Sequence, residues 1–136
     1  MTRFVLDCSV TMAWCFEDEA DRYSDGVLAA LSRNAVIVPG LWPLEVANVL
    51  LVSERRGRLG SEDARRFLKH LAGLPITVDA TVPDASEILA LGRTHNLSAY
   101  DAAYLHLAIR ERLPLATRDR TLRAAARAAR VVSFAP

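Results

Sequence analysis

Short apolar runs alternate along this chain with longer segments in which apolar residues recur every three or four positions. The short runs are typical of buried strands, and the longer recurrence predicts helices. We predict strands at residues 3–6, 35–38, 75–78, 115–117 and 131–133. Helices are predicted at residues 9–16, 18–31, 41–56, 61–71 (with Ser61 as N-cap), from 81 or 84 to 95, and at 99–112 and 120–129. This alternation predicts a three-layer α/β/α domain with a central parallel sheet of about five strands.

The composition narrows the class of protein further. A length of 136 residues predicts a single domain over residues 1–136, and 51% hydrophobic residues suffice for a core and exclude a disordered chain. No apolar run approaches the roughly 20 residues of a membrane-spanning helix, and Asp7 comes too early for a signal peptide. The two cysteines, Cys8 and Cys15, form no C-x-x-C motif, so we expect a protein of the reducing cytoplasm.

Two acidic residues follow predicted strands. Asp7 comes directly after the first strand, and Asp119 lies two residues beyond the fourth. The carboxyl ends of parallel strands meet at one edge of a sheet, where open α/β sheets carry their functional sites. We therefore expect Asp7 and Asp119 to lie at the same edge.

Two further acidic residues, Glu45 and Asp101, lie in otherwise apolar helical segments. A buried, unpaired carboxylate costs several kcal/mol, and four carboxylates near one edge would raise one another's pKa values. A divalent cation removes both costs. Carboxylates without histidine or cysteine favour Mg²⁺ or Mn²⁺ over zinc.

Each of these acids also has a purely structural explanation. Asp119 could be the N-cap of the last helix, and Asp101, three residues after Ser98, could complete a capping box. Glu45 could pair with an arginine, and Asp7 could cap the short helix that follows it. The spacing alone leaves the structural explanation and the metal site equally open.

Four blocks of the sequence resemble the PIN-domain family, specifically the VapC-type toxins of bacterial toxin–antitoxin pairs. These blocks are VLDCSV at residues 5–10, PLEVANVL at 43–50, LSAYDAAYLHLA at 97–108 and LATRD at 115–119. The resemblance covers essentially the whole chain, and it implies a metal-dependent ribonuclease with a parallel sheet.

The resemblance also implies roles for individual residues. Four residues match the acidic quartet of the family, which holds Mg²⁺ or Mn²⁺: Asp7, Glu45, Asp101 and Asp119. Three residues match the polar positions that support this quartet: Ser9, Asn48 and Thr117. The implied partners are an RNA substrate, a second copy of the chain in a homodimer, and a VapB-type antitoxin that inserts into the active-site groove.

For such an enzyme, Asp7, Asp101 and Asp119 would be metal ligands, and Glu45 would be a further ligand or would orient the attacking water. Arg118 and Arg120 flank Asp119, which makes them candidates for contacts with RNA phosphates. The net charge of +1 argues against non-specific coating of nucleic acid and favours selection of an RNA shape or single-stranded loop.

Two alternatives remain. A phosphohydrolase or phosphoacceptor domain would use Asp7 as its nucleophile. Such sites need a nearby lysine, but the only lysine, Lys69, is in a predicted helix away from this edge, and Ser9 stands where a second Asp would be expected. The other alternative is a non-catalytic RNA-binding PIN-like module.

Overall fold

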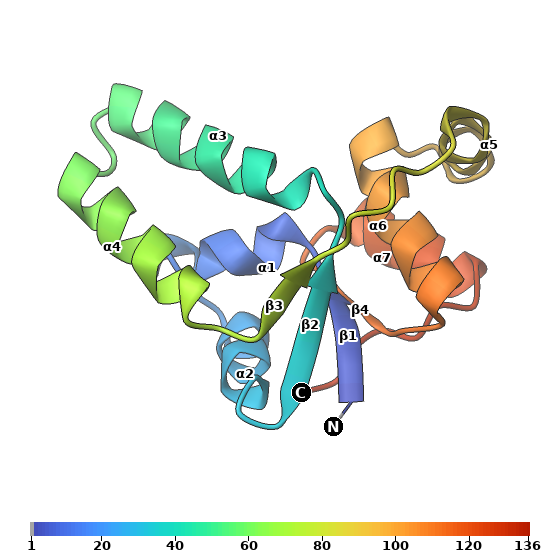
Figure 1. Ribbon diagram of the computed structural model, residues 1–136, viewed down its shortest axis with the longest axis horizontal. Helices are drawn as coiled ribbons and strands as arrows, with labels where there is room; N and C mark the ends of the chain where they lie inside the picture. Colours follow the sequence, from blue (N-terminus) through green and yellow to red (C-terminus); the bar gives the residue numbers. More distant parts are fainter. Residues whose placement is uncertain (1) are drawn as a thin grey trace.

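A computed structural model describes residues 2–136. Its centre is a four-stranded parallel sheet in the order β3-β2-β1-β4 (Figure 1). The strands are β1 (Thr2–Leu6), β2 (Asn34–Val38), β3 (Ile76–Val78) and β4 (Leu115–Ala116). This confirms the predicted fold class.

Within residues 2–136, seven helices cover the sheet in two layers (Figure 1). On one side lie α1 (Cys8–Ala13), α2 (Arg22–Ala30), α3 (Trp42–Arg55) and α4 (Ser61–Ala72), and a 3₁₀ turn at Glu17–Glu19 precedes α2. On the other side lie α5 (Ala85–His95), α6 (Ala99–Glu111) and α7 (Arg120–Ala128). None of the helices within residues 2–136 is both long enough and apolar enough to cross a membrane.

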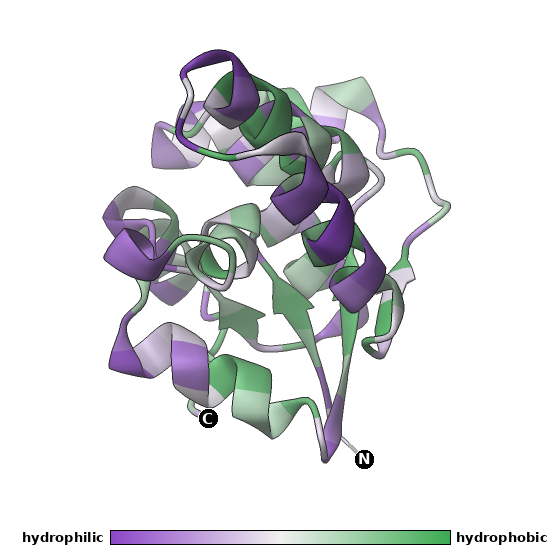
Figure 2. Ribbon diagram, turned by 90° about the vertical axis from the view of Figure 1, so that its left-hand side faces the viewer, coloured by the Kyte–Doolittle hydropathy of each residue, from purple (hydrophilic) through white to green (hydrophobic). Residues whose placement is uncertain are grey.

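The central strand β1 is buried on both faces. Phe4, Val5 and Leu6 have no exposed surface, and the ring of Phe4 stacks on that of Phe134 with centroids 3.8 Å apart. Figure 2 shows the strands as the apolar interior beneath helices with polar outer faces. Burial on both faces explains why the buried part of β1 reads as a continuous apolar run in the sequence.

The strand register determines which residues meet at the carboxyl edge of the sheet. Leu6 pairs with Ala116, so β1 and β4 end side by side. The residues that follow, Asp7 and Thr117, therefore emerge next to each other. Helices α1, α3 and α7 all begin shortly after a strand ends at this edge, so their first turns surround it.

Three predicted details are wrong. The fifth strand, at 131–133, is reduced to one isolated bridge between Leu115 and Ser133. The helix predicted over 18–31 begins only at Arg22, because the Asp21 carboxylate accepts a hydrogen bond from the Ser24 backbone N–H and caps it there. Ser61 is the first residue of α4, and Gly60 is the N-cap.

Candidate functional site

Asp7 is at the centre of the carboxyl edge of the sheet. Its backbone N–H donates to the carbonyl oxygen of Ala116 over 2.9 Å, and its side chain is only 5% exposed. Its Oδ2 atom accepts hydrogen bonds from Ser9 Oγ at 2.6 Å and Thr117 Oγ1 at 2.8 Å. Asp7 stands at the N-cap position of α1 but makes no capping hydrogen bond through its side chain. Its carboxylate is therefore oriented by two hydroxyl groups.

The same two hydroxyl groups connect Asp7 to the loop before α7. Thr117 Oγ1 accepts a hydrogen bond from the backbone N–H of Asp119 at 3.0 Å. Ser9 Oγ accepts one from the backbone N–H of Arg118, also at 3.0 Å. The structure thus brings Ser9 and Thr117 together with two of the predicted acidic residues.

Asp119 caps α7, as the structural explanation for it expects. Its Oδ1 atom accepts a hydrogen bond from the backbone N–H of Leu122 at 2.9 Å. The other oxygen, Oδ2, makes no hydrogen bond to any residue within 2–136. Capping uses only one carboxylate oxygen, so it does not prevent Asp119 from binding a ligand through the other.

Glu45 and Asp101 approach the same edge from α3 and α6. Each lies in the first turn of its helix and is half-buried. Glu45 Oε1 accepts a hydrogen bond from the hydroxyl of Tyr104 at 2.5 Å. The helix containing Asp101 is capped by Ser98, whose Oγ accepts the Asp101 backbone N–H at 3.1 Å. The cap uses only the backbone of Asp101 and leaves its carboxylate uncommitted.

The four acidic residues influence one another electrostatically. Burial is the main cause that raises the pKa values of Asp7, Glu45 and Asp101. The charge of Asp7 raises the pKa of Glu45 and of Asp101, and the charge of Asp119 raises that of Asp7 and of Asp101. Across residues 2–136, no arginine, lysine or histidine forms a salt bridge with any of the four. The alternative explanation of Glu45, a salt bridge with an arginine, is therefore wrong for the described residues.

As the side chains stand, no three His, Cys, Asp or Glu residues in the described part of the chain are arranged to hold a metal ion. The donor set nevertheless fits a hard divalent cation, because it consists of oxygens and lacks a neutralising cation.

Burial, together with the charges of Glu45 and Asp7, raises the pKa of the Cys8 thiol, which therefore remains a neutral group.

A hollow of about 530 Å³ lies beside Asp119. Its lining residues are Ser9, Asp21, Tyr23, Arg118, Asp119, Arg120 and Arg123. Both predicted phosphate-contacting arginines line it, but they differ in their surroundings. The guanidinium of Arg118 donates to Asp21 Oδ2 at 2.8 Å and lies 3.9 Å from Glu19. Arg120 is exposed and forms no ion pair with residues 2–136.

The structure does not connect Asn48 to the acidic residues. It is exposed on α3, and its side chain makes no hydrogen bond within the part of the chain that is described. The partner of Glu45 is instead Tyr104, which the sequence analysis missed. Tyr104 lies three residues after Asp101 and therefore on the same face of α6, which was the one available signal.

The fold and the site together define a class of protein: a three-layer α/β/α domain with an all-oxygen acidic site at the carboxyl edge of a parallel sheet. The family model described as PIN domain matches residues 4–128 of the chain. The protein belongs to the PIN domain family.

Solved structures with the same fold include several from bacteria and archaea. PAE2754 from Pyrobaculum aerophilum is 24% identical, with a TM-score of 0.72 over 91% of this chain and 84% of that one. VapBC2 from Rickettsia felis, bound to a DNA fragment from its promoter, is 11% identical, with a TM-score of 0.64 over 98% of each chain. FitAcB from Neisseria gonorrhoeae is 19% identical, with a TM-score of 0.57 over 98% and 97%. No curated protein sequence matches this chain.

Proposed function

We propose that this protein is a metal-dependent endoribonuclease and the toxin of a toxin–antitoxin pair. The observation that carries the nuclease assignment is the group of four carboxylates at the carboxyl edge of the sheet, where three have raised pKa values and none has a cationic partner among residues 2–136. Such a site is poised to exchange mutual repulsion for the binding of a doubly charged ion.

Asp7, Asp101 and Asp119 would hold Mg²⁺ or Mn²⁺, and Glu45 would either join them or orient the attacking water. A bound divalent ion lowers the pKa of water and neutralises charge that develops on phosphorus. Ser9 and Thr117 hold the Asp7 carboxylate in one orientation, in the manner of polar groups that position metal ligands. Water would attack phosphorus in line and displace the 3′-oxygen of the preceding nucleotide, so that the products would be a 5′-phosphate and a 3′-hydroxyl.

Arg120 would contact the phosphate of the RNA at this site. It is exposed, and it lines the hollow in which Asp119 lies. Arg118 lines the same hollow, but its guanidinium is already paired through Nε with Asp21, which reduces its attraction for a phosphate. Arg120 is therefore the stronger candidate of the two, and we retain Arg118 as the second.

The proposal of a toxin rests on membership of the PIN domain family and on the similarity in fold to VapBC2 from Rickettsia felis. The proposed partners are a VapB-type antitoxin and a second copy of the chain, and the proposed compartment is the cytoplasm.

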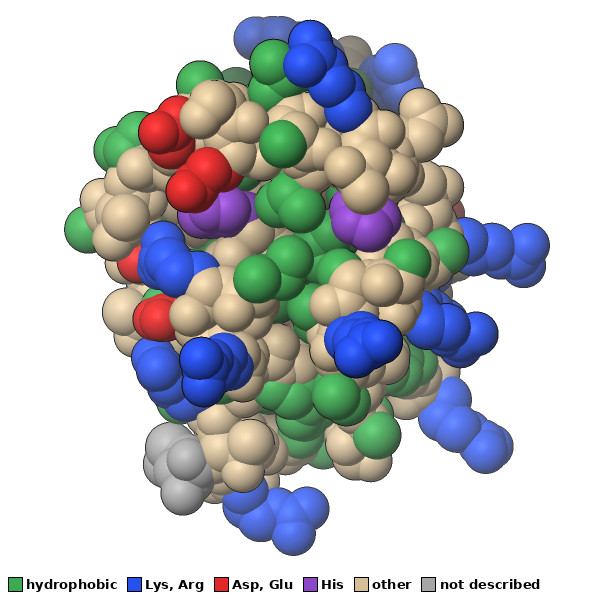
Figure 3. All heavy atoms as spheres, turned by 90° about the vertical axis from the view of Figure 1, so that its right-hand side faces the viewer, with side chains coloured by type: hydrophobic (Ala, Val, Ile, Leu, Met, Phe, Trp, Pro, Cys, Tyr) green, Lys and Arg blue, Asp and Glu red, His purple; other side chains and the backbone are tan. Residues whose placement is uncertain are grey.

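Apolar side chains gather on the face formed by α5, α6 and α7, between histidines and arginines (Figure 3). Exposed apolar residues on these elements and the segment after them include Leu89, Tyr100, Ile109 and Val132. A surface of this kind suits a protein partner.

The test is cleavage of end-labelled RNA by the purified protein with Mg²⁺, with and without a chelator. We expect cleavage that the chelator abolishes and that Mg²⁺ or Mn²⁺ restores. Hydrolysis of a phosphate monoester with no RNA cleavage would instead favour the phosphohydrolase, although Lys69 is exposed on α4, a helix outside the site. RNA binding without cleavage would favour the non-catalytic module.

Replacement of Tyr104 by Phe tests how Glu45 is positioned. The Tyr104 hydroxyl donates to Glu45 and lowers its pKa, so its loss raises that pKa further. The rise of the cleavage rate with increasing pH is then expected to occur at higher pH than in the wild type. At pH values below this rise, cleavage by the variant should be about tenfold slower. Rate profiles of the wild type and Y104F over the same pH range measure this. If the cleavage rate rose at the same pH in both proteins, Glu45 would have no part in the reaction.

A further inference from the structure

Positive charge is concentrated at the C-terminal end of the chain. Residues 118–136 contain five of the seventeen basic residues but only one of the sixteen acidic residues. This segment therefore carries a net charge of +4, whereas the whole chain carries +1. The other 117 residues carry a net charge of −3, so the net positive charge of the protein comes from α7 and the residues next to it.

The arginines of this segment follow one side of α7. Arg120, Arg123 and Arg127 recur at intervals of three and four residues, and Arg130 continues the series just beyond the helix. The opposite side of α7 is buried through its apolar residues Leu122, Ala125 and Ala126. Arg123 and Arg127 are separated by about 6 Å along the helix axis, so they can contact successive groups of one extended ligand.

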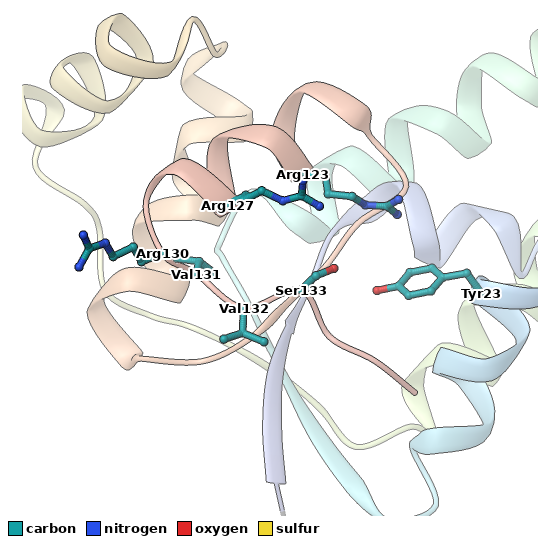
Figure 4. Close-up of a pocket in the computed structure, with 7 residues that line it drawn as sticks. All are labelled: Tyr23, Arg123, Arg127, Arg130, Val131, Val132 and Ser133. Atoms are coloured by element: carbon teal, nitrogen blue, oxygen red, sulfur yellow. The ribbon is translucent and has the colours of Figure 1, made fainter.

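A second hollow, of about 590 Å³, runs along this side of α7 (Figure 4). Its lining residues are Tyr23, Arg123, Arg127, Arg130, Val131, Val132 and Ser133. It shares Tyr23 and Arg123 with the hollow at Asp119. The two hollows therefore adjoin at these two side chains, and the arginines of α7 extend away from the hollow at Asp119.

Arg123 lies where the two hollows join, and the protein holds it in place. Its guanidinium donates to the carbonyl oxygen of Thr117 at 2.7 Å and lies 5.6 Å from the centroid of the Tyr23 ring. Arg127 and Arg130 are exposed, and their side chains make no ion pair or hydrogen bond with residues 2–136. Their charge is available to an anionic ligand from outside.

We propose that the hollow along α7 is a binding track for the part of an RNA strand next to the scissile phosphate. Arg123, Arg127 and Arg130 bind its successive phosphates, and Tyr23 lies beside the strand where the track meets the acidic site. The inference rests on the proposed nuclease function, because it is the acidic site that gives the track its starting point.

Three features favour a single RNA strand as the occupant. The cations form one line along a helix rather than a broad face, which suits one backbone. Guanidinium groups bind phosphate oxygens through two parallel hydrogen bonds. An aromatic ring beside a basic groove is typical of sites for single-stranded nucleic acid. An acidic segment of a protein would match the charge of the track but would make no use of Tyr23.

The test measures binding rather than cleavage. Fluorescence anisotropy with a labelled single-stranded RNA of about 12 nucleotides, in EDTA, gives the affinity and its salt dependence. The double variant Arg127→Gln and Arg130→Gln is expected to bind at least about tenfold more weakly. The slope of log affinity against log salt should also fall by about 1.4, because two phosphate contacts are lost. The matched control is Arg33→Gln with Arg93→Gln, which removes the same charge from exposed residues elsewhere and should bind as the wild type does.

Each outcome decides one question. Equal loss of affinity in both double variants would mean that net charge, and not the track, attracts RNA. An oligoglutamate peptide of similar charge that competes as well as RNA would assign the hollow to an acidic protein segment. Unchanged binding by the α7 variant, with RNA cleaved normally, overturns the track and leaves the nuclease intact. Weakened binding in a protein that never cleaves RNA would retain the α7 arginines as an RNA-binding surface but would rule out the nuclease function.

Discussion

Replacement of Asp7 by Asn is expected to slow RNA cleavage by about 10³-fold or more, with no loss of thermal stability. Asp7 is the most buried of the four acidic residues, and its charge reaches both Glu45 and Asp101. Loss of this carboxylate would remove a proposed ligand for the divalent ion. The proposed site would also have one negative charge fewer and would attract the ion less strongly. The rate of cleavage of labelled RNA at saturating Mg²⁺ measures the effect.

The stability of this variant follows from the surroundings of Asp7. Burial raises the pKa of Asp7, so the folded state bears a cost for its charge near neutral pH. Asparagine is neutral and nearly the same size, and its carbonyl oxygen can still accept the hydrogen bonds of Ser9 and Thr117. The unfolding temperature in EDTA should therefore equal or exceed that of the wild type.

A matched control distinguishes the loss of a site residue from the loss of any carboxylate. Asp25→Asn makes the same chemical change on α2, where Asp25 is exposed and forms no ion pair with residues 2–136. It should cleave RNA at the wild-type rate. Undiminished cleavage by D7N would show that Asp7 has no part in the reaction and would overturn the proposed site.

The position of Asp7 and Asp119 was predictable because both depend on local features. Each follows an apolar run that becomes a parallel strand, and parallel strands place their carboxyl ends at one edge. The fifth strand was not predictable from its apolar residues. Val132 in the predicted strand is 68% exposed, so the run lacks the burial that its composition suggests.

Contacts between distant residues could not be read from the sequence. Tyr104 reaches Glu45 across 59 positions, and Asp21 binds Arg118 across 97. No spacing rule relates residues that far apart, because their proximity depends on how α3, α6 and the loop before α2 pack. The sequence therefore suggested Arg118 as a candidate for a phosphate contact without indicating Asp21, the acidic partner that already binds it.

Mg²⁺ is expected to raise the unfolding temperature of the wild type near neutral pH. At a concentration of about 100 times its dissociation constant, a bound ion stabilises the folded state by about 2.7 kcal/mol, which corresponds to about 10 °C for a domain of this size. Differential scanning fluorimetry with Mg²⁺, against choline chloride at equal ionic strength, measures the shift. An equal rise with choline chloride would mean that only screening is involved.

The pH dependence of this shift has a definite sign. The folded-state pKa values of Asp7, Glu45 and Asp101 are raised, so their contribution to stability without metal is greatest at low pH and is lost as pH rises through those values. Protons and Mg²⁺ compete for the same oxygens, so the shift should be large near about pH 7.5 and vanish near about pH 4.

The variant Asp101→Asn separates two contributions to stability: the repulsion between the carboxylates in the absence of metal, and the stabilisation by bound Mg²⁺. Its loss of charge relieves the repulsion from Asp7 and Asp119, so we expect its unfolding temperature in EDTA near neutral pH to rise above that of the wild type. The same change removes a proposed ligand, so its response to Mg²⁺ should largely disappear. A variant that is more stable without the ion and indifferent to it is difficult to explain by damage to the fold. If D101N responded to Mg²⁺ as the wild type does, the ion would bind elsewhere and the proposed centre would be wrong.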